Sequence, residues 1–345
     1  MVPMENKVIA FTAPKVAEYL DCEIPVLKEN EVLVELAVST ISSGTERANL
    51  LGEVNVSVAT VDTEARFPRY CGYSSSGTVV ALGQAVTDFA IGDRVALSWS
   101  THSKYVAIDH KNLHKILDDR VSFEEAALWH IGTFPMAAIR KCRFEVGESA
   151  IVMGMGILGL FAVKLLAASG AAPLIAVDPV AEKRELALKI GADYAFDPFD
   201  PDFANKVKEV TDGGVNVAIE VTGNGGALNG VLDCMKKMGR VALLGCTRSS
   251  DFTIDYYHKV HGPGISLIGA HTAARPIDES SAGLWTTHDD VMAMQRLNKF
   301  GRLEFASLIE ETHSPTEAFE VYTRLATEKA FPIVQFDWRN EPCVK

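Results

Sequence analysis

The sequence predicts an α/β protein that combines a doubly wound parallel sheet with a separate β-rich domain. The first observation is the stretch 150–170, where a short apolar run leads into a glycine-rich turn and then into apolar residues at helical spacing. The second is the alternation of strand and helix patterns from about 148 to 270, which is typical of a parallel sheet with helices on both faces. Short strands with frequent glycine turns from Lys7 to about 147 predict a mostly antiparallel β domain before it.

The glycine-rich turn has the spacing of a dinucleotide-binding loop. Gly154 permits a tight turn, Gly156 lets the backbone approach a pyrophosphate, and Gly159 lets the helix pack closely on the strand. A second apolar run, 174–177, ends in Asp178 about 20 residues further on, where a carboxylate can accept hydrogen bonds from ribose hydroxyls. The alternative is a structural turn between strand and helix with an incidental aspartate.

The predicted cofactor is NAD rather than NADP, because the charge of Asp178 would repel a 2′-phosphate. We also assign to the cofactor site Ile157 and Leu158 in the turn, and Thr222 and Gly245, which follow two later predicted strands.

Composition limits the classes of function. The 345 residues are 48% hydrophobic, which is enough for more than one core, so we expect two domains. A net charge of −12 argues against nucleic acid and anionic membranes as partners and favours a small-molecule substrate. The six cysteines are scattered without CxxC spacing, which fits reduced thiols. The sequence shows no signal-peptide pattern and no apolar window of about 18 residues. Together these observations predict a soluble cytoplasmic protein.

Further elements follow from periodicity and capping signals. Ser122, with a Glu three residues later, forms a capping-box pattern that predicts a helix start. We predict helices at 182–190, 203–211, 227–237, 288–299 and 315–327. We predict strands at 32–36, 77–83, 93–97, 215–221, 241–244, 265–268 and 333–336.

This order of parts resembles the medium-chain dehydrogenase/reductase superfamily over nearly the whole chain. Three phrases carry the resemblance: EVLVE at 31–35, GDRV at 92–95 and KIGAD at 189–193. The resemblance implies a GroES-like catalytic domain, a Rossmann NAD-binding domain and a C-terminal return that packs on the catalytic domain. We place these domains at 1–147, 148–284 and 285–345.

Zinc-dependent members of that superfamily carry a cysteine, a histidine and a third ligand before the nucleotide domain. The corresponding positions here hold Ser43, Tyr73 and His130, and neutral hydroxyls are poor replacements for thiolate and imidazole. The family's loop of four cysteines for structural zinc should lie near 97–103, and that segment contains none. We therefore expect no metal site.

Without zinc, other groups must polarise the substrate oxygen. In relatives the hydroxyl at the position of Thr45 bonds the reacting alcohol, and Thr45 keeps that hydroxyl. The acid/base group is then His130 or Tyr73, with Ser43 and Glu46 completing the predicted catalytic set. The structural alternatives are a hydrogen-bonded core histidine at 130, a packing aromatic at 73 and a loop-orienting carboxylate at 46.

Other histidines are weaker candidates. His102 precedes a phrase, 103–106, that resembles a family segment beside the substrate, so a substrate contact is one possibility for it. His110 and His114 are expected on the surface.

The sequence therefore predicts an NAD-dependent, zinc-independent oxidoreductase that moves a hydride between nicotinamide and a secondary alcohol or ketone. Resemblance to polyol dehydrogenases around 126–140 favours a sugar, polyol or cyclitol. The alternatives are a quinone or enoyl reductase of the same superfamily, and a non-catalytic NAD-binding protein. The apolar run 265–270 resembles the edge strand through which such nucleotide domains pair, so we expect a homodimer or homotetramer.

Overall fold

The computed structural model describes residues 5–57, 64–248 and 251–339, which form two compact units. Unit 1 comprises the described parts of Met1–Ile131 and Met294–Lys345, and unit 2 comprises those of Gly132–Ala293. The chain passes from one unit to the other inside two helices, α3 (Trp129–Lys141) and α8 (Thr287–Lys299). The divisions expected from the sequence, 147/148 and 284/285, lie instead in the connections that follow α3 and precede α8.

Unit 1 contains two sheets. A three-stranded sheet has the order β2-β1-β4, and a larger sheet has the order β15-β16-β3-β5-β6-β8, with β7 paired to β3. The strands are β1 (Asn6–Ala13), β2 (Val16–Cys22), β3 (Glu31–Thr40), β4 (Arg69–Tyr70), β5 (Ser74–Leu82), β6 (Arg94–Ser98), β7 (Tyr105–Asp109), β8 (Leu113–Lys115), β15 (Glu311–His313) and β16 (Val334–Asp337). Most pairs are antiparallel, as predicted, and β15 with β16 is a parallel pair.

Short helices connect these strands. They are α1 (Ser43–Leu50), α2 (Phe123–Ala126), α9 (Ala318–Thr327), and the helical turns η1 (His110–Asn112), η3 (Ala306–Leu308) and η4 (Pro315–Glu317). The predicted helix start at Ser122 is confirmed, because its side chain accepts a hydrogen bond from the N–H of Glu125 at 3.2 Å.

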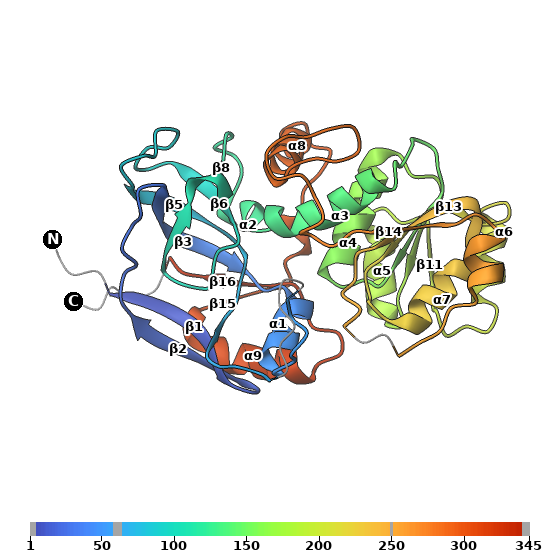
Figure 1. The fold of residues 1–345 in the computed structure, drawn as a ribbon, viewed down its shortest axis with the longest axis horizontal. Helices are drawn as coiled ribbons and strands as arrows, with labels where there is room; N and C mark the ends of the chain where they lie inside the picture. Colours follow the sequence, from blue (N-terminus) through green and yellow to red (C-terminus); the bar gives the residue numbers. More distant parts are fainter. Residues whose placement is uncertain (1–4, 58–63, 249–250, 340–345) are drawn as a thin grey trace. The chain divides into compact units, whose positions relative to one another are not determined.

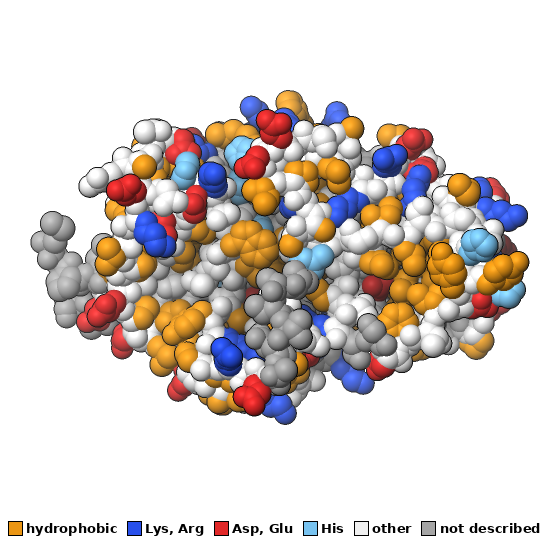
Figure 2. Space-filling model, in the orientation of Figure 1, with side chains coloured by type: hydrophobic (Ala, Val, Ile, Leu, Met, Phe, Trp, Pro, Cys, Tyr) orange, Lys and Arg blue, Asp and Glu red, His pale blue; other side chains and the backbone are white. Residues whose placement is uncertain are grey.

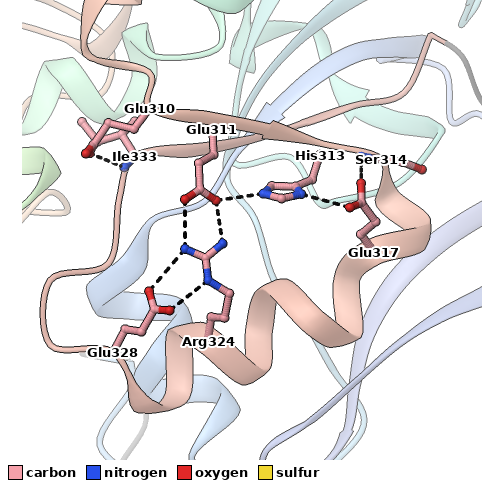
Figure 3. A network of polar contacts seen from close by, with 8 residues as sticks. All are labelled: Glu310, Glu311, His313, Ser314, Glu317, Arg324, Glu328 and Ile333. Carbon is pink, nitrogen blue, oxygen red and sulfur yellow. Dashed lines mark hydrogen bonds and ion pairs between the residues drawn. The ribbon is translucent and has the colours of Figure 1, made fainter.

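The C-terminal segment packs back on unit 1, as the sequence predicted. Strand β16 pairs antiparallel with β3, where Gln335 lies opposite Thr40. Buried Glu125 accepts hydrogen bonds of 2.7 Å from the N–H groups of both Phe305 and Ala306. Strand β15 and helix α9 are joined by an ionic network centred on Arg324 (Figure 3). The last described strand, β16, thereby joins the main sheet of unit 1 between β3 and β15.

Unit 2 is built on a parallel six-stranded sheet with the order β11-β10-β9-β12-β13-β14. Its strands are β9 (Ala150–Met153), β10 (Leu174–Val177), β11 (Tyr194–Phe196), β12 (Val215–Glu220), β13 (Met235–Leu243) and β14 (Ser266–Gly269). Numbered by sequence within the sheet, this is the order 3-2-1-4-5-6 of dinucleotide-binding sheets. The doubly wound α/β fold is therefore confirmed.

Helices lie around this sheet (Figure 1). They are α4 (Ile157–Ser169), α5 (Ala181–Lys189), α6 (Phe203–Val210), α7 (Gly225–Asp233) and the π-helical turn η2 (Tyr257–His261). The predicted helix at 227–237 was wrong at its end, because α7 stops at Asp233 and β13 already begins at Met235. Met235 lies opposite Val215 before the register shifts, so pairing with β12 overrides the local helical pattern there.

Charged side chains are mixed over the surface. On the face drawn in Figure 2, the described lysines and arginines are interspersed with acidic side chains and form no continuous basic area. Within the described ranges, no helix is long and apolar enough to cross a membrane.

Candidate active site

The predicted phosphate-binding turn lies between β9 and α4. Gly154 has a φ of +101°, a conformation that side-chain-bearing residues rarely adopt. A Cβ on Gly159 would lie 1.8 Å from the carbonyl oxygen of Gly154, so only glycine permits this contact between helix and turn. Gly156 precedes the helix and makes no side-chain cap, which leaves the N–H groups of the first turn of α4, at Ile157 and Leu158, suited to a phosphate.

Asp178 lies directly against this turn. It is 8% exposed, and its carboxylate accepts hydrogen bonds from the N–H of Met155 at 2.7 Å and the N–H of Val180 at 2.9 Å. Each carboxylate oxygen can accept two hydrogen bonds, so acceptor capacity remains for a ribose. Folding therefore brings Asp178 to the glycine turn across 23 residues of sequence.

Thr222, which follows the end of β12, lies beside the same turn, and Gly245, which follows the end of β13, lies against Val221 and Gly223 on either side of Thr222. A Cβ on Gly154 would lie 2.8 Å from Cγ2 of Thr222, and one on Gly245 would lie 2.2 Å from the nitrogen of Gly223. In open parallel sheets, ligands bind outside the carboxyl ends of strands where the strand order reverses, here between β9 and β12. The structure thus gathers all the predicted cofactor residues at one edge of unit 2.

Sequence analysis missed Glu220, which organises this edge. Its buried carboxylate accepts hydrogen bonds from the N–H groups of Thr222 at 2.7 Å and Gly223 at 3.1 Å, and from the Thr222 hydroxyl. Burial raises the pKa of Glu220. A glutamate ending an otherwise apolar strand, directly before Val-Thr-Gly, is the signal that could have identified it.

In unit 1, helix α1 carries Ser43, Thr45 and Glu46. The Glu46 side chain points into the core, where it accepts hydrogen bonds from the N–H of Ser42 at 2.8 Å and the Tyr322 hydroxyl at 2.5 Å. Its other contact is Nε2 of His102 at 3.0 Å. Of the two roles considered for Glu46, these contacts favour orienting the segment that carries Ser43 and Thr45.

His102 is a buried core residue. Its Nδ1 lies 2.7 Å from Oγ of Ser39, so both ring nitrogens make hydrogen bonds inside unit 1. The expectation of a surface position for His114 was wrong, because this residue is buried and its Nε2 lies 3.0 Å from Oγ of Ser98. Neither Ser39 nor Ser98 is a sequence neighbour of the histidine that it contacts.

Tyr73 and His130 come together with a third aromatic residue, Trp99. The rings of Tyr73 and His130 meet edge to face with centroids 5.7 Å apart, and those of Trp99 and His130 are 4.7 Å apart. The Tyr73 hydroxyl hydrogen-bonds to Oγ of Ser42, directly before α1. The structure therefore connects Tyr73 both to His130 and to the segment that carries Ser43 and Thr45.

The residues at the family's zinc positions do not fit a zinc ion. They are one imidazole and two neutral hydroxyls, and the Tyr73 hydroxyl is engaged by Ser42. Across the part of the chain that the structure describes, no three His, Cys, Asp or Glu side chains are placed to hold a metal together. We derive no chemistry through zinc.

Comparison with known proteins agrees with this architecture. Residues 28–141 match the alcohol dehydrogenase GroES-like domain, and residues 158–282 match the zinc-binding dehydrogenase family, a range that contains none of the three zinc positions. D-guloside 3-dehydrogenase from Escherichia coli (strain K12) is 25% identical over 288 residues, which are 78% of this chain and 82% of that relative.

Solved structures share the fold. Galactitol-1-phosphate dehydrogenase from Escherichia coli has a TM-score of 0.82 at 19% identity, covering 96% of this chain and 99% of the other. A structure from Sinorhizobium meliloti 1021 that is described as a zinc-binding dehydrogenase and is bound to NADP has a TM-score of 0.80 at 20% identity, covering 96% of this chain and 99% of the other.

Proposed function

The chain belongs to the medium-chain dehydrogenase/reductase superfamily, in its alcohol dehydrogenase-like branch, and on that basis we propose that it is an NAD-dependent, zinc-independent dehydrogenase acting on a CH–OH group of a sugar, polyol or cyclitol. One observation carries the proposal. The sheet of unit 2 has the strand order 3-2-1-4-5-6, with the glycine turn after its first strand and Asp178 after its second.

The residues at this edge fit a nicotinamide dinucleotide. The N–H groups at the start of α4 would bind the pyrophosphate. Gly154, Thr222 and Gly245 pack closely at this edge, so that the backbone itself can approach the ligand. The Asp178 carboxylate would accept hydrogen bonds from the ribose hydroxyls. Its negative charge would repel the 2′-phosphate of NADP and so favour NAD. A nicotinamide held at this edge would supply the acceptor for the hydride that leaves the carbon bearing the substrate hydroxyl.

Protons are handled by residues of unit 1. The hydroxyl of Thr45 hydrogen-bonds the substrate, and the alcohol proton passes either to the neutral His130 imidazole or to Tyr73 as its phenolate, which becomes the phenol as the carbonyl forms. In the reverse direction the same group donates that proton to the developing alkoxide. Tyr73 is held for this role by Ser42, and Ser42 in turn is held by Glu46. Ser43, the first residue of α1, adds a second serine hydroxyl next to that of Ser42.

The substrate class is supported by the curated relative, which acts on the 3-position of a guloside according to its name. A ring or chain with several hydroxyl groups also suits a site built from hydroxyl and imidazole groups.

The proposal includes a homodimer or homotetramer in the cytoplasm. Strand β14 lies at the end of its sheet, and Leu267 on it is 36% exposed, which leaves an apolar edge for a second copy to cover. Cys22, Cys71, Cys142, Cys234 and Cys246 are free thiols, in keeping with a reducing compartment, and Cys343 lies outside the described residues.

Turnover of a compound panel tests the function. Purified protein is incubated with NAD⁺ and a set of glycosides, cyclitols and open-chain polyols, and NADH formation is followed before and after exhaustive chelation. We expect NADH formation with at least one compound, unchanged by chelation, and well under one zinc per chain by elemental analysis. A full equivalent of zinc, lost together with activity, would show that the reaction needs the metal; NAD binding without any turnover would favour the non-catalytic alternative.

A further inference from the structure

Glu125 is a buried carboxylate whose two oxygens contact two different parts of unit 1. The residue is 4% exposed. Its Oε2 accepts hydrogen bonds of 2.7 Å from the N–H groups of Phe305 and Ala306, in the C-terminal segment. Its Oε1 accepts from Nε1 of Trp129 at 3.3 Å and from Nδ2 of Asn298 at 3.4 Å. One carboxylate thus joins the C-terminal segment to the start of α3.

Trp129 is the first residue of α3 and directly precedes His130, a candidate acid/base group. Trp129 is fully buried, so its indole N–H has no access to water and needs an acceptor within the protein. Glu125 supplies that acceptor. Because the indole is a rigid ring, holding it at its N–H also holds the backbone from which His130 projects.

The backbone just before Trp129 is attached to the main sheet. The carbonyl of Ala127 accepts hydrogen bonds from Oγ of Ser74 at 2.6 Å and from Oγ1 of Thr40 at 2.9 Å. These two side chains belong to β5 and β3. Glu125 attaches the next part of the same segment to the C-terminal residues instead. The orientation of the His130 ring therefore depends on both attachments.

We propose that Glu125 is a positioning residue, which acts through the indole N–H of Trp129 to orient the His130 imidazole for proton transfer. The inference rests on the proposed function, in which His130 is one of the two groups that handle the substrate proton. Proton transfer needs heavy atoms about 2.6–3.2 Å apart, so a displacement of the imidazole by about 1 Å slows the reaction. Anchoring of the C-terminal segment alone would need only Oε2, whereas the contact of Oε1 links Glu125 to His130.

Glu125→Gln separates the roles of the two oxygens. A glutamine side chain has one acceptor oxygen and one donor nitrogen, and all four partners of Glu125 are N–H donors. The bonds from the C-terminal backbone are the shorter ones, so the glutamine oxygen should remain there and its NH₂ group should oppose the indole N–H. We expect kcat to fall roughly 10- to 100-fold with KM changed little.

Glu124→Gln is the matched control. This neighbouring glutamate is half-buried and pairs with Arg339, Nη2 to Oε1 at 2.6 Å, without contacting Trp129. Its kcat should stay at the wild-type value. An equal loss of kcat in Glu124→Gln and Glu125→Gln, or no loss in either, would overturn the inference.

A double variant tests whether Glu125 acts through Trp129. Trp129→Phe removes the indole N–H but keeps a buried aromatic ring and leaves the carboxylate and its C-terminal contacts in place. Adding Glu125→Gln to Trp129→Phe should lower kcat little further, because the contact is already lost. Losses of kcat that multiply fully would show that the two residues act separately and would overturn the inference. Should Glu125→Gln fail to fold, Trp129→Phe decides by the NMR measurement that follows.

Histidine NMR gives a readout that does not require turnover. The ring signals of His130, assigned by their loss in His130→Ala, should shift in Glu125→Gln and in Trp129→Phe and stay at their wild-type positions in Glu124→Gln. Unshifted signals in the first two variants, or shifted signals with wild-type kcat, would overturn the inference. Shifted signals in a protein that oxidises no compound of the panel would support the positioning contact and count against the proposed function instead.

Discussion

The hydroxyl of Tyr322 donates a hydrogen bond of 2.5 Å to the carboxylate of Glu46, across 276 positions of sequence. This contact ties α9, near the end of the chain, to α1, which carries Ser43 and Thr45. Burial and the neighbouring carboxylate raise the pKa of Tyr322 well above its usual value, so the hydroxyl keeps its proton and remains a donor. The C-terminal return thus supports the candidate catalytic segment directly.

Replacing Tyr322 by Phe removes this donor. We expect the free energy of unfolding to fall by about 1–3 kcal/mol, because a buried carboxylate loses one of its partners. Urea denaturation measures the change. Tyr70→Phe, at a site that is 57% exposed, is the control and should stay within about 0.5 kcal/mol of the wild type. Equal stability of the two variants would show that the contact contributes nothing.

His130 and Tyr73 compete for the role of acid/base group. His130→Ala should lower kcat by roughly 10²–10⁴-fold and remove the limb of the pH–rate profile near neutrality, with NADH affinity unchanged. If His130 is only a packing residue, this variant loses stability and keeps its pH profile, and the loss of kcat appears in Tyr73→Phe instead. Full activity in both folded variants would remove both residues from the mechanism.

Asp178 sets cofactor choice in the proposal. Asp178→Ser removes the negative charge and two hydrogen-bond acceptors of backbone N–H groups, so NADH affinity should fall roughly tenfold while NADPH binding improves relative to it. Fluorescence titration with each cofactor measures both. Asp212→Asn, exposed and at a φ of 49° that asparagine tolerates, is the control. A wild type that binds NADPH as tightly as NADH would contradict the assignment.

The network of Figure 3 makes stability depend on pH. Hydrogen bonding to Arg324 lowers the pKa of Glu311 to about 2 from an ordinary 4.5. A carboxylate whose pKa is lowered by folding stabilises the protein at pH values above its ordinary pKa. This stabilisation is lost as the pH falls from about 4.5 towards 2. The difference in stability between wild type and Glu311→Gln should therefore shrink over that range in urea titrations. Glu320→Gln, exposed on α9, the helix that carries Arg324, should show no such pH-dependent difference.

His313 adds the opposite dependence. Burial acts to lower the pKa of His313, but hydrogen bonds to Glu311 and Glu317 outweigh it and the pKa is raised. Its contribution is therefore complete below the ordinary histidine pKa and is lost as the pH rises through the raised value. His313→Gln should remove this loss of stability at higher pH. At acid pH, the dependence of stability on pH should still be dominated by Glu311.

Strand β14 should carry the subunit contact. We expect at least a dimer by light scattering at micromolar concentration, and Leu267→Lys should shift it towards the monomer by placing a charge on the exposed edge. Leu188→Lys changes a leucine that is 45% exposed on α5 and should leave the assembly intact. A monomeric wild type would sink this expectation.

Much of unit 2 could be predicted from the sequence because its signals are local. Gly154 and Gly159 are required by the backbone of a single turn, and Asp178 follows the next strand at a spacing that the fold imposes. The misplaced boundary between α7 and β13 lies where pairing with a distant strand decides the conformation. The departure from the zinc ligand pattern stays a prediction, because it depends on residue identity at positions that the resemblance assigns.

The candidate catalytic arrangement in unit 1 was decided by tertiary structure. Resemblance in the sequence predicts that Ser43, Thr45, Tyr73 and His130 stand at the family's catalytic positions, but it could not show that Ser42 engages the Tyr73 hydroxyl or that Glu46 turns inward to Tyr322. Trp99 gave no signal, because its left-handed backbone is imposed by partners on other strands and its ring meets a histidine 31 positions later. Local spacing specifies a turn that closes on itself, whereas contacts between residues far apart in sequence exist only once the sheets have assembled.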